Sequence, residues 1–118
     1  AGRRLAPWDA RAQLTAADLN AEWDGDWSRT RFDAVVSLQA LHDLGAEAQV
    51  EGAYARAAAQ LAPGGLLLNA DLVDETGERP GRMPAARHLE LMNRHGLERT
   101  VCTFDDGVFV CCLGYAPV

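Results

Sequence analysis

Three polar side chains follow or end apolar segments, at positions where they can do chemistry. His42 and Asp43 come shortly after the apolar segment Phe32–Leu38, and Asp71 lies near the end of a second one, 66–72. Histidine titrates near neutral pH, so His42 can take a proton from a hydroxyl or an amine as a general base. The carboxylates of Asp43 and Asp71 can line the pocket that binds the molecule with this hydroxyl or amine. The alternatives are a structural contact between His42 and the next helix, and ordinary loop acidity for the carboxylates.

The other histidines and the cysteines predict neither a metal site nor a redox site. His88 and His95 are seven residues apart and can share a helix face, but no third ligand accompanies them. Three cysteines, two of them adjacent, do not form a disulfide framework. They favour buried free thiols and a reducing, cytoplasmic compartment. A two-residue turn at 106–107 would place Cys102 opposite Cys111.

Length and charge exclude several classes of protein. A chain of 118 residues makes one domain with its own core. Its 17 acidic and 11 basic residues give a formal net charge of −6, which opposes binding to nucleic acid or to an anionic membrane surface. No apolar run is long enough to span a bilayer. We therefore expect neither a nucleic-acid partner nor a membrane partner.

Short apolar runs alternate with helical periodicity, which predicts an α/β fold with a mostly parallel sheet. Residues 1–8 predict the end of a helix closed by Pro7, and 74–84 predict a loop rich in glycine and proline. A Pro-Gly-Gly sequence at 63–65 is expected to end the first long helix. An Asp-Asp-Gly turn is expected to join the last two strands as an antiparallel hairpin. The predicted strands are 11–19, 32–38, 66–72, 100–104 and 108–115, and the predicted helices are 46–61 and 84–94.

Four segments carry a resemblance to a known family. Segment 31–44 reads RFDAVVSLQALHDL, segment 61–72 reads LAPGGLLLNADL, and 88–115 holds a helix, a Gly-Leu turn and the hairpin. In this order they resemble the fourth strand, the junction before the fifth strand and the closing hairpin of class I S-adenosylmethionine-dependent methyltransferases. Segment 11–19 resembles the family's third strand. The resemblance covers nearly the whole chain and implies a Rossmann-like fold containing strands 3–7 of a seven-stranded sheet.

The resemblance also implies a cofactor, S-adenosylmethionine, and residues that contact it. Asp18 would accept a hydrogen bond from the adenine amine, and Leu19 would pack against the adenine ring. The backbone of Ser37, Leu38 and Gln39 would touch the methionine part, at the end of the sheet where open α/β folds bind ligands. The alternatives are a local cap for Asp18 and an ordinary strand-to-helix connection for the other three.

The sequence departs from the family in one respect. It has no counterpart of the Gly-rich loop after strand 1 or of the acidic residue that ends strand 2. In the family's strand order, 3-2-1-4-5-7-6, strands 1 and 2 separate strand 3 from strand 4. Segment 11–19 then lacks a neighbour, and Phe32–Leu38 becomes an exposed apolar edge. We expect one of three explanations. A missing N-terminal half of the fold pairs with this edge, a second copy in a homo-oligomer pairs with it, or the strands of this chain are connected in a different order.

The leading functional hypothesis is therefore a methyltransferase with a small-molecule acceptor. Residues 1–118 would form a single, partial domain that is inactive alone, since the half that grips the ribose is absent. The alternative is a non-catalytic, methyltransferase-like module used for dimerisation or partner binding. A third hypothesis, a flavodoxin-like binding domain, agrees poorly with the terminal hairpin. The identity of the acceptor cannot be read from the sequence, because specificity in such folds lies in loops.

Overall fold

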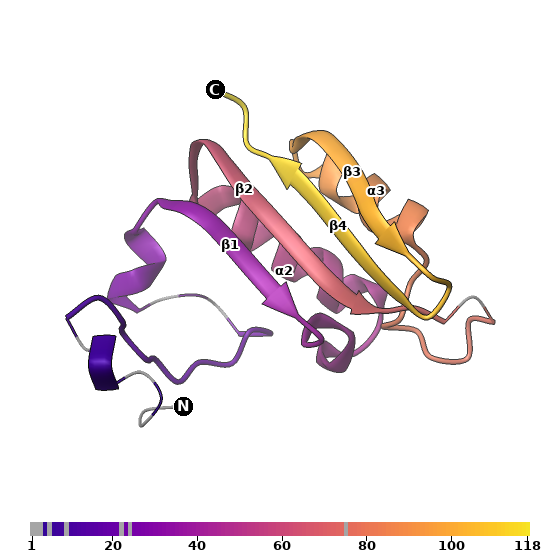
Figure 1. Cartoon of the computed structure of the whole chain (residues 1–118), viewed down its shortest axis with the longest axis horizontal. Helices are drawn as coiled ribbons and strands as arrows, with labels where there is room; N and C mark the ends of the chain where they lie inside the picture. The colour runs from indigo at the N-terminus through magenta and orange to yellow at the C-terminus, as the bar shows by residue number, and fades with distance from the viewer. Residues whose placement is uncertain (1–3, 5, 9, 22, 24, 75) are drawn as a thin grey trace.

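A four-stranded mixed sheet organises the chain (Figure 1). The computed structural model describes residues 4, 6–8, 10–21, 23, 25–74 and 76–118. The strand order is β1-β2-β4-β3. The strands are β1 (Phe32–Leu38), β2 (Leu61–Leu72), β3 (Glu98–Asp105) and β4 (Phe109–Tyr115). The α/β class and the terminal hairpin are confirmed, and the four strands follow the expected 4-5-7-6 order.

The mostly parallel character expected of the sheet is not confirmed in the described residues. β1 pairs in parallel with β2, whereas β4 pairs antiparallel with both β2 and β3. One parallel pairing therefore accompanies two antiparallel ones. The physical reason is the closing hairpin, which contributes two of the four strands and reverses the chain direction next to β2.

Segment 11–19 does not form the predicted strand. Residues 12–18 have no regular secondary structure, residues 11 and 19 lie in turns, and Leu14 is 60% exposed. An isolated strand leaves its backbone groups without partners, so alternating apolar residues alone do not make one. Ala6–Trp8 form a short 3-10 helix that contains Pro7, and the rest of that predicted helix end lies largely outside the described residues.

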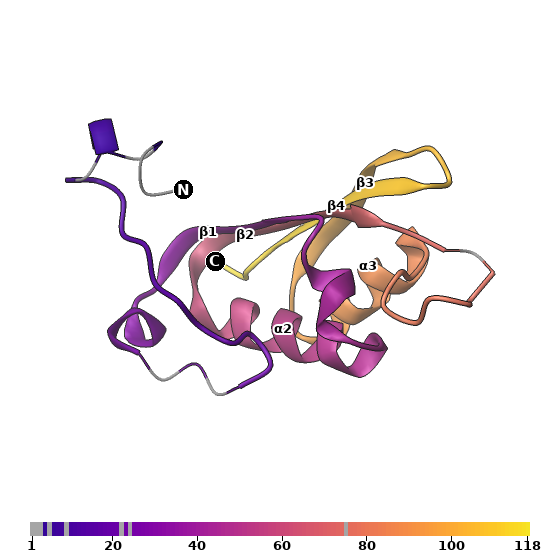
Figure 2. The ribbon, with the colours of Figure 1, turned by 90° about the horizontal axis from the view of Figure 1, so that it is seen from below.

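The two long helices cover the same face of the sheet, as Figure 2 shows. Helix α2 (Glu47–Gln60) buries Val50, Tyr54 and Ala57, the face that its helical spacing predicts. It ends three residues before Pro63, because Leu61 takes up extended backbone angles and already enters β2. Helix α3 (Ala85–Arg94) begins after Pro84 as expected and is also joined to the sheet through buried residues, His88, Leu91 and Met92.

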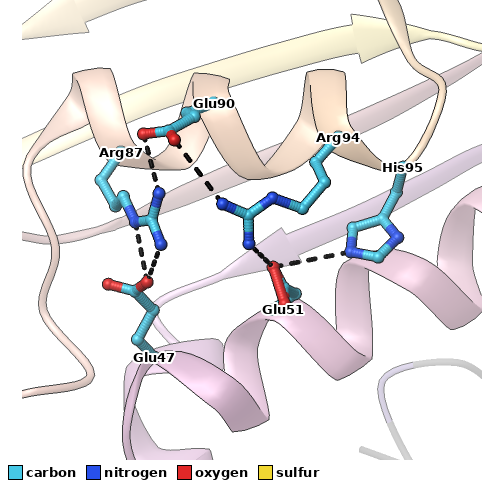
Figure 3. Close-up of polar contacts among 6 residues, drawn as sticks. All are labelled: Glu47, Glu51, Arg87, Glu90, Arg94 and His95. Carbon is cyan, nitrogen blue, oxygen red and sulfur yellow. Dashed lines mark hydrogen bonds and ion pairs between the residues drawn. The ribbon is translucent and has the colours of Figure 1, made fainter.

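A chain of ion pairs joins the outer sides of α2 and α3 (Figure 3). Glu47 bonds to the Arg87 guanidinium, and Glu51 accepts from Arg94 at 2.7 Å. Glu90 bridges the two arginines along α3. His95 lies 3.7 Å from Glu51 at the far end of the chain. These contacts link the two helices on their solvent side.

The hairpin register differs from the prediction. Three residues, 106–108, connect β3 to β4 instead of two, and the register shifts again between Cys102 and Phe104. Cys102 therefore pairs with Cys112 and not with Cys111. The Asp106 carboxylate stabilises the longer turn by accepting the backbone N–H groups of Val108 and Phe109 at 3.0 and 2.8 Å.

Candidate functional site

His42 and Asp71 meet where β1 and β2 end. His42 belongs to a short 3-10 helix, η3 (Leu41–Leu44), that follows β1, and Asp71 lies near the end of β2. Because β1 and β2 are parallel, with Leu38 opposite Ala70, the two segments reach the same edge of the sheet. The His42 Nδ1 atom lies 2.5 Å from Asp71 Oδ1.

The Asp71 carboxylate is held in one orientation. The His42 backbone N–H donates to Oδ2 at 3.0 Å, and the Leu72 N–H donates to Oδ1 at 2.8 Å. Asp71 is 1% exposed, so no solvent competes for these bonds. The carboxylate therefore fixes both the backbone and the ring of His42.

This contact decides which nitrogen of His42 is available for chemistry. In the neutral ring only one nitrogen carries a hydrogen, and the shorter, buried contact with Asp71 assigns it to Nδ1, which leaves the lone pair on Nε2. Asp43 Oδ1 lies 3.2 Å from Nε2, and the Asp43 side chain is 78% exposed. It can receive the new N–H once the ring has taken up a proton. An imidazole oriented in this way by a buried acid can take up a proton at Nε2.

The turn between β1 and η3 carries backbone strain. Gln39 has φ 49°, in the left-handed region, and its N–H donates to the Ala70 carbonyl at 2.8 Å. For a residue with a side chain this conformation costs on the order of 1 kcal/mol. The bend turns the chain out of β1 and leads it into η3, where His42 meets Asp71.

The predicted cofactor residues divide into two groups. Leu19, Ser37 and Leu38 line an apolar cavity of about 370 Å³ between β1, α2 and the segment before β1. Gln39 and Asp18 are not among its lining residues. Asp18 is exposed and accepts the Asn20 N–H at 2.9 Å, which is the local contact weighed as its alternative. The described lining of the cavity includes no carboxylate.

A buried polar network lies beside Asp71, and sequence reasoning missed it. Asn69 donates to the Tyr54 hydroxyl at 2.9 Å, and that hydroxyl donates to His88 Nδ1 at 2.7 Å. Burial lowers the pKa of His88 and raises the pKa of Tyr54, so both are neutral near pH 7. One signal was present in the sequence, because Asn69 and Asp71 are two residues apart in an apolar strand and must share a face.

Solved structures identify the fold. No protein-family model matches the sequence, and the comparison with curated proteins gave no match. The DszA carbon methyltransferase superposes with a TM-score of 0.78 at 13% identity, covering 98% of this chain and 36% of that one. An O-methyltransferase family protein from Burkholderia thailandensis gives 0.75 at 15% identity, with 98% and 39% covered. This chain has a methyltransferase fold.

A third neighbour adds a bound ligand to the comparison. The N-methyltransferase NodS from Bradyrhizobium japonicum WM9, in complex with S-adenosyl-L-homocysteine, gives a TM-score of 0.68 at 19% identity. The superposition covers 99% of this chain and 61% of NodS. The chain thus spans roughly a third to two-thirds of the length of these methyltransferases, and at such low identity the likeness concerns the fold. It matches part of the methyltransferase fold, as the sequence resemblance implied.

Neither a metal centre nor a membrane-spanning helix is found among the described residues. Within them, no group of three or more His, Cys, Asp or Glu side chains has an arrangement that could hold a metal ion. None of the helices there combines the length and the apolar character that crossing a membrane requires.

Proposed function

We propose that this chain is the C-terminal part of an S-adenosylmethionine-dependent methyltransferase, in which His42 is the general base. The observation that carries the proposal is the contact between His42 and the buried Asp71, at the carboxyl ends of two parallel strands. Ligands of open α/β sheets bind at this edge. The methyltransferase fold of the solved neighbours supports the same reaction class.

The chemistry that His42 contributes is removal of one proton. When bound, S-adenosylmethionine would supply a methyl group whose bond to the positively charged sulfur breaks as the acceptor attacks, so that a neutral thioether leaves. His42 would contribute at the acceptor, where its Nε2 takes up the proton that the acceptor atom releases. Asp71 keeps Nδ1–H directed away from the acceptor, and Asp43 can turn toward the imidazolium. The proton then leaves to solvent along the exposed Asp43 side chain.

The residues of this chain fit one end of the cofactor. The apolar cavity beside Leu19, Ser37 and Leu38 suits a flat aromatic base or the aliphatic methionine chain. We propose that these residues, with Asp18 and Gln39 at their ends, form the part of the cofactor site that this chain supplies. Carboxylates for the ribose hydroxyls must come from elsewhere, and we expect the chain alone to be inactive for that reason.

We propose a small molecule as the methyl acceptor. The net charge of −6 opposes binding to nucleic acid. The neighbours are described as O-, N- and carbon methyltransferases, so the fold accommodates all three acceptor atoms and selects none. In this proposal the exposed Asp43 faces the acceptor, whereas the buried Asp71 acts on the acceptor through its bond to His42. We place the protein in the cytoplasm, on the strength of its three free cysteines.

We propose that the free edge of β1 pairs with a further strand, from an N-terminal half of the fold or from a second copy. β1 is the outermost strand of the described sheet, and Val36 and Leu38 are 68% and 69% exposed. Light scattering of the chain after gel filtration tests this proposal. A dimer supports pairing between copies, whereas a soluble monomer that binds no added N-terminal half refutes edge pairing. A dimer that ignores the cofactor favours the alternative role of a non-catalytic module.

The main experiment uses the natural polypeptide that carries this sequence. Binding of S-adenosylhomocysteine is measured by calorimetry, and methyl transfer is measured with labelled cofactor on hydroxyl, amine and activated-carbon acceptors. We expect His42→Gln to lower the rate by about 10²- to 10⁴-fold with unchanged cofactor affinity. His95→Gln is the matched control, because His95 lies at the outer ion-pair chain. Cofactor binding with full activity in His42→Gln refutes the base, and no cofactor binding refutes the methyltransferase.

A further inference from the structure

Gly81 stands directly against the turn that carries His42. It lies in the loop between β2 and α3 and is buried, unlike the exposed residues 76–80 before it. A Cβ atom at this position would come within 2.5 Å of the Gly45 carbonyl oxygen and closer still to that of His42. Real Cβ atoms do not approach carbonyl oxygens so closely. The loop and η3 are therefore in backbone-to-backbone contact at this point.

Gly81 is a glycine for reasons of space and not of conformation. Its φ lies outside the left-handed region, so an alanine can adopt the same backbone angles. Gly77 in the same loop is the opposite case. It has φ 76°, and a Cβ atom added there would meet nothing within 4 Å, so its requirement is conformational. The loop thus contains both kinds of glycine, four residues apart.

The loop that presents Gly81 is internally fixed by Asp74. Its carboxylate accepts the Thr76 N–H at 2.9 Å, the Thr76 hydroxyl at 2.6 Å and the Arg79 N–H at 3.1 Å. The hydrogen bond from the Thr76 side chain lowers the pKa of Asp74. The Asp74 N–H also donates to the Arg82 carbonyl at 2.7 Å, which closes the loop just beyond Gly81.

The His42 turn is consequently held from two sides. Asp71 binds its backbone N–H and its ring from the β2 side. The loop packs against the carbonyls of His42 and Gly45 from the other side, and Gly81 is the point of contact. A displacement of these carbonyls moves the His42 backbone, and with it the ring, relative to a carboxylate that cannot follow because it is buried.

We propose that Gly81 is a positioning residue for His42, and that the Asp74-closed loop between β2 and α3 sets the tautomer of the candidate base by its contact with the His42 turn. As a role in catalysis this rests on the proposed function, but the effect on the ring exists without it. In Gly81→Ala the added methyl group displaces the His42 turn, and the Nδ1 bond to Asp71 is lost. The free ring then returns to the Nε2–H tautomer that neutral histidine prefers in water.

The first test is nitrogen-15 NMR of the three histidine rings in this chain, at a pH where they are neutral. We expect His42 to be the Nδ1–H tautomer in the wild type and predominantly Nε2–H in Gly81→Ala. The His88 signals report on the core and should not move. Gly77→Asn is the matched control, since asparagine tolerates a positive φ and meets open space there. An unchanged His42 tautomer in a folded Gly81→Ala overturns the proposal.

A second variant keeps the test decisive if Gly81→Ala does not fold. Asp74→Asn adds no atom near His42 but weakens the bonds that close the loop. We expect a smaller change of His42 in the same direction, and no change in a folded Asp74→Asn overturns the proposal.

Activity of the natural polypeptide separates this inference from the proposed function. We expect Gly81→Ala to lower kcat by about 100-fold, with the affinity for S-adenosylhomocysteine retained. A tautomer change in a protein whose wild type transfers no methyl group supports the positioning role and refutes the methyltransferase. A tautomer change with full activity refutes the link between the two.

Discussion

The two faces of the sheet are built from similar residues but meet different surroundings. On the face beneath α2 and α3, Leu67, Asn69 and Asp71 of β2 are each 1% exposed. On the opposite face, Val36 and Leu38 of β1 are 68% and 69% exposed. One row on that face crosses all four strands and consists of Val36, Leu68, Leu113 and Val101. No helix of the described chain covers it (Figure 2).

Polar side chains are held in a fixed geometry on the covered face of the sheet and not on the open one. A nearly continuous apolar strand is typical of sheets covered on both faces, and here one cover belongs to the chain. Among the described residues, the buried polar side chains are Gln60 at the end of the covering helix α2, and Asn69, Asp71 and His88 on the covered side. Only there is water excluded, and hydrogen bonds to a carboxylate or an imidazole hold one geometry. The open face instead exposes apolar side chains such as Val36 and Leu38.

The strongest test of this difference compares one leucine on each face. Leu67→Ala removes a fully buried side chain from the covered face, and we expect it to lower the free energy of unfolding by about 3 kcal/mol. Leu38→Ala removes an exposed side chain from the open face, with an expected change below about 0.5 kcal/mol. Urea unfolding followed by circular dichroism measures both.

The outcome for Leu38 decides whether the second face is really open in solution. Equal losses for the two variants would contradict the comparison and mean that another surface covers Leu38. A stability that rises with protein concentration in the wild type but not in Leu38→Ala would identify that surface as a second copy.

The next effect concerns the buried His88 and is sensitive to pH. Burial lowers its pKa, and the Asp71 charge, the Met83 carbonyl and Glu47 oppose this effect only in part. The unfolded chain therefore binds a proton near pH 6.5, where the folded chain does not. Stability falls as the pH drops below about 6.5, by at most about 1.4 kcal/mol per pH unit, until the folded pKa is reached.

A variant isolates this slope. His88→Asn keeps an acceptor for the Tyr54 hydroxyl but does not titrate, so we expect a lower stability that is nearly independent of pH between 6.5 and 5. Unfolding free energies measured across this range check it. A wild-type slope that persists in His88→Asn would assign the effect to another titrating group.

Sequence reasoning predicted the elements that depend on local periodicity and missed those that depend on pairing. The edge strand Phe32–Leu38, helix α2 and the start of α3 after Pro84 are confirmed, since each follows from burial patterns or backbone limits. The prediction of a strand at 11–19 is wrong, because a strand also needs a neighbouring strand that accepts and donates its backbone hydrogen bonds. The hairpin register was wrong because one extra turn residue and a bulge shift it, and neither has a clear composition signal.

For the candidate site, the sequence indicated the residue types but not their contacts. His42 and Asp71 were named separately, 29 positions apart, and only the parallel register of β1 and β2 brings their atoms together. Gly81 was hidden in a loop that already held another glycine with a conformational reason to be there. A glycine required by close approach looks the same in a sequence as one required by its φ angle.

The smallest expected effect tests whether the covering helices are held by burial or by charge. In Glu47→Gln the ion pair from α2 to Arg87 on α3 is lost (Figure 3). The hydrogen bond from Arg87 lowers the pKa of Glu47, so its contribution is present above the usual carboxyl range and is lost as the pH falls through the lowered value. Both groups are solvent-accessible, so salt screens the pair.

We therefore expect Glu47→Gln to lower the free energy of unfolding less than Leu67→Ala or His88→Asn does. We also expect the stability of Glu47→Gln to depend less on salt and on acid pH than that of the wild type. Glu98→Gln, at an exposed position at the start of β3, is the matched control for loss of one negative charge. The comparison of the two faces attributes the cover to buried residues such as Tyr54, Leu91 and Met92. If Glu47→Gln lowered the free energy of unfolding as much as Leu67→Ala, charge would be the main force that holds the helices on the sheet. Apolar side chains on the open face would then not be enough to bind a partner in the same way.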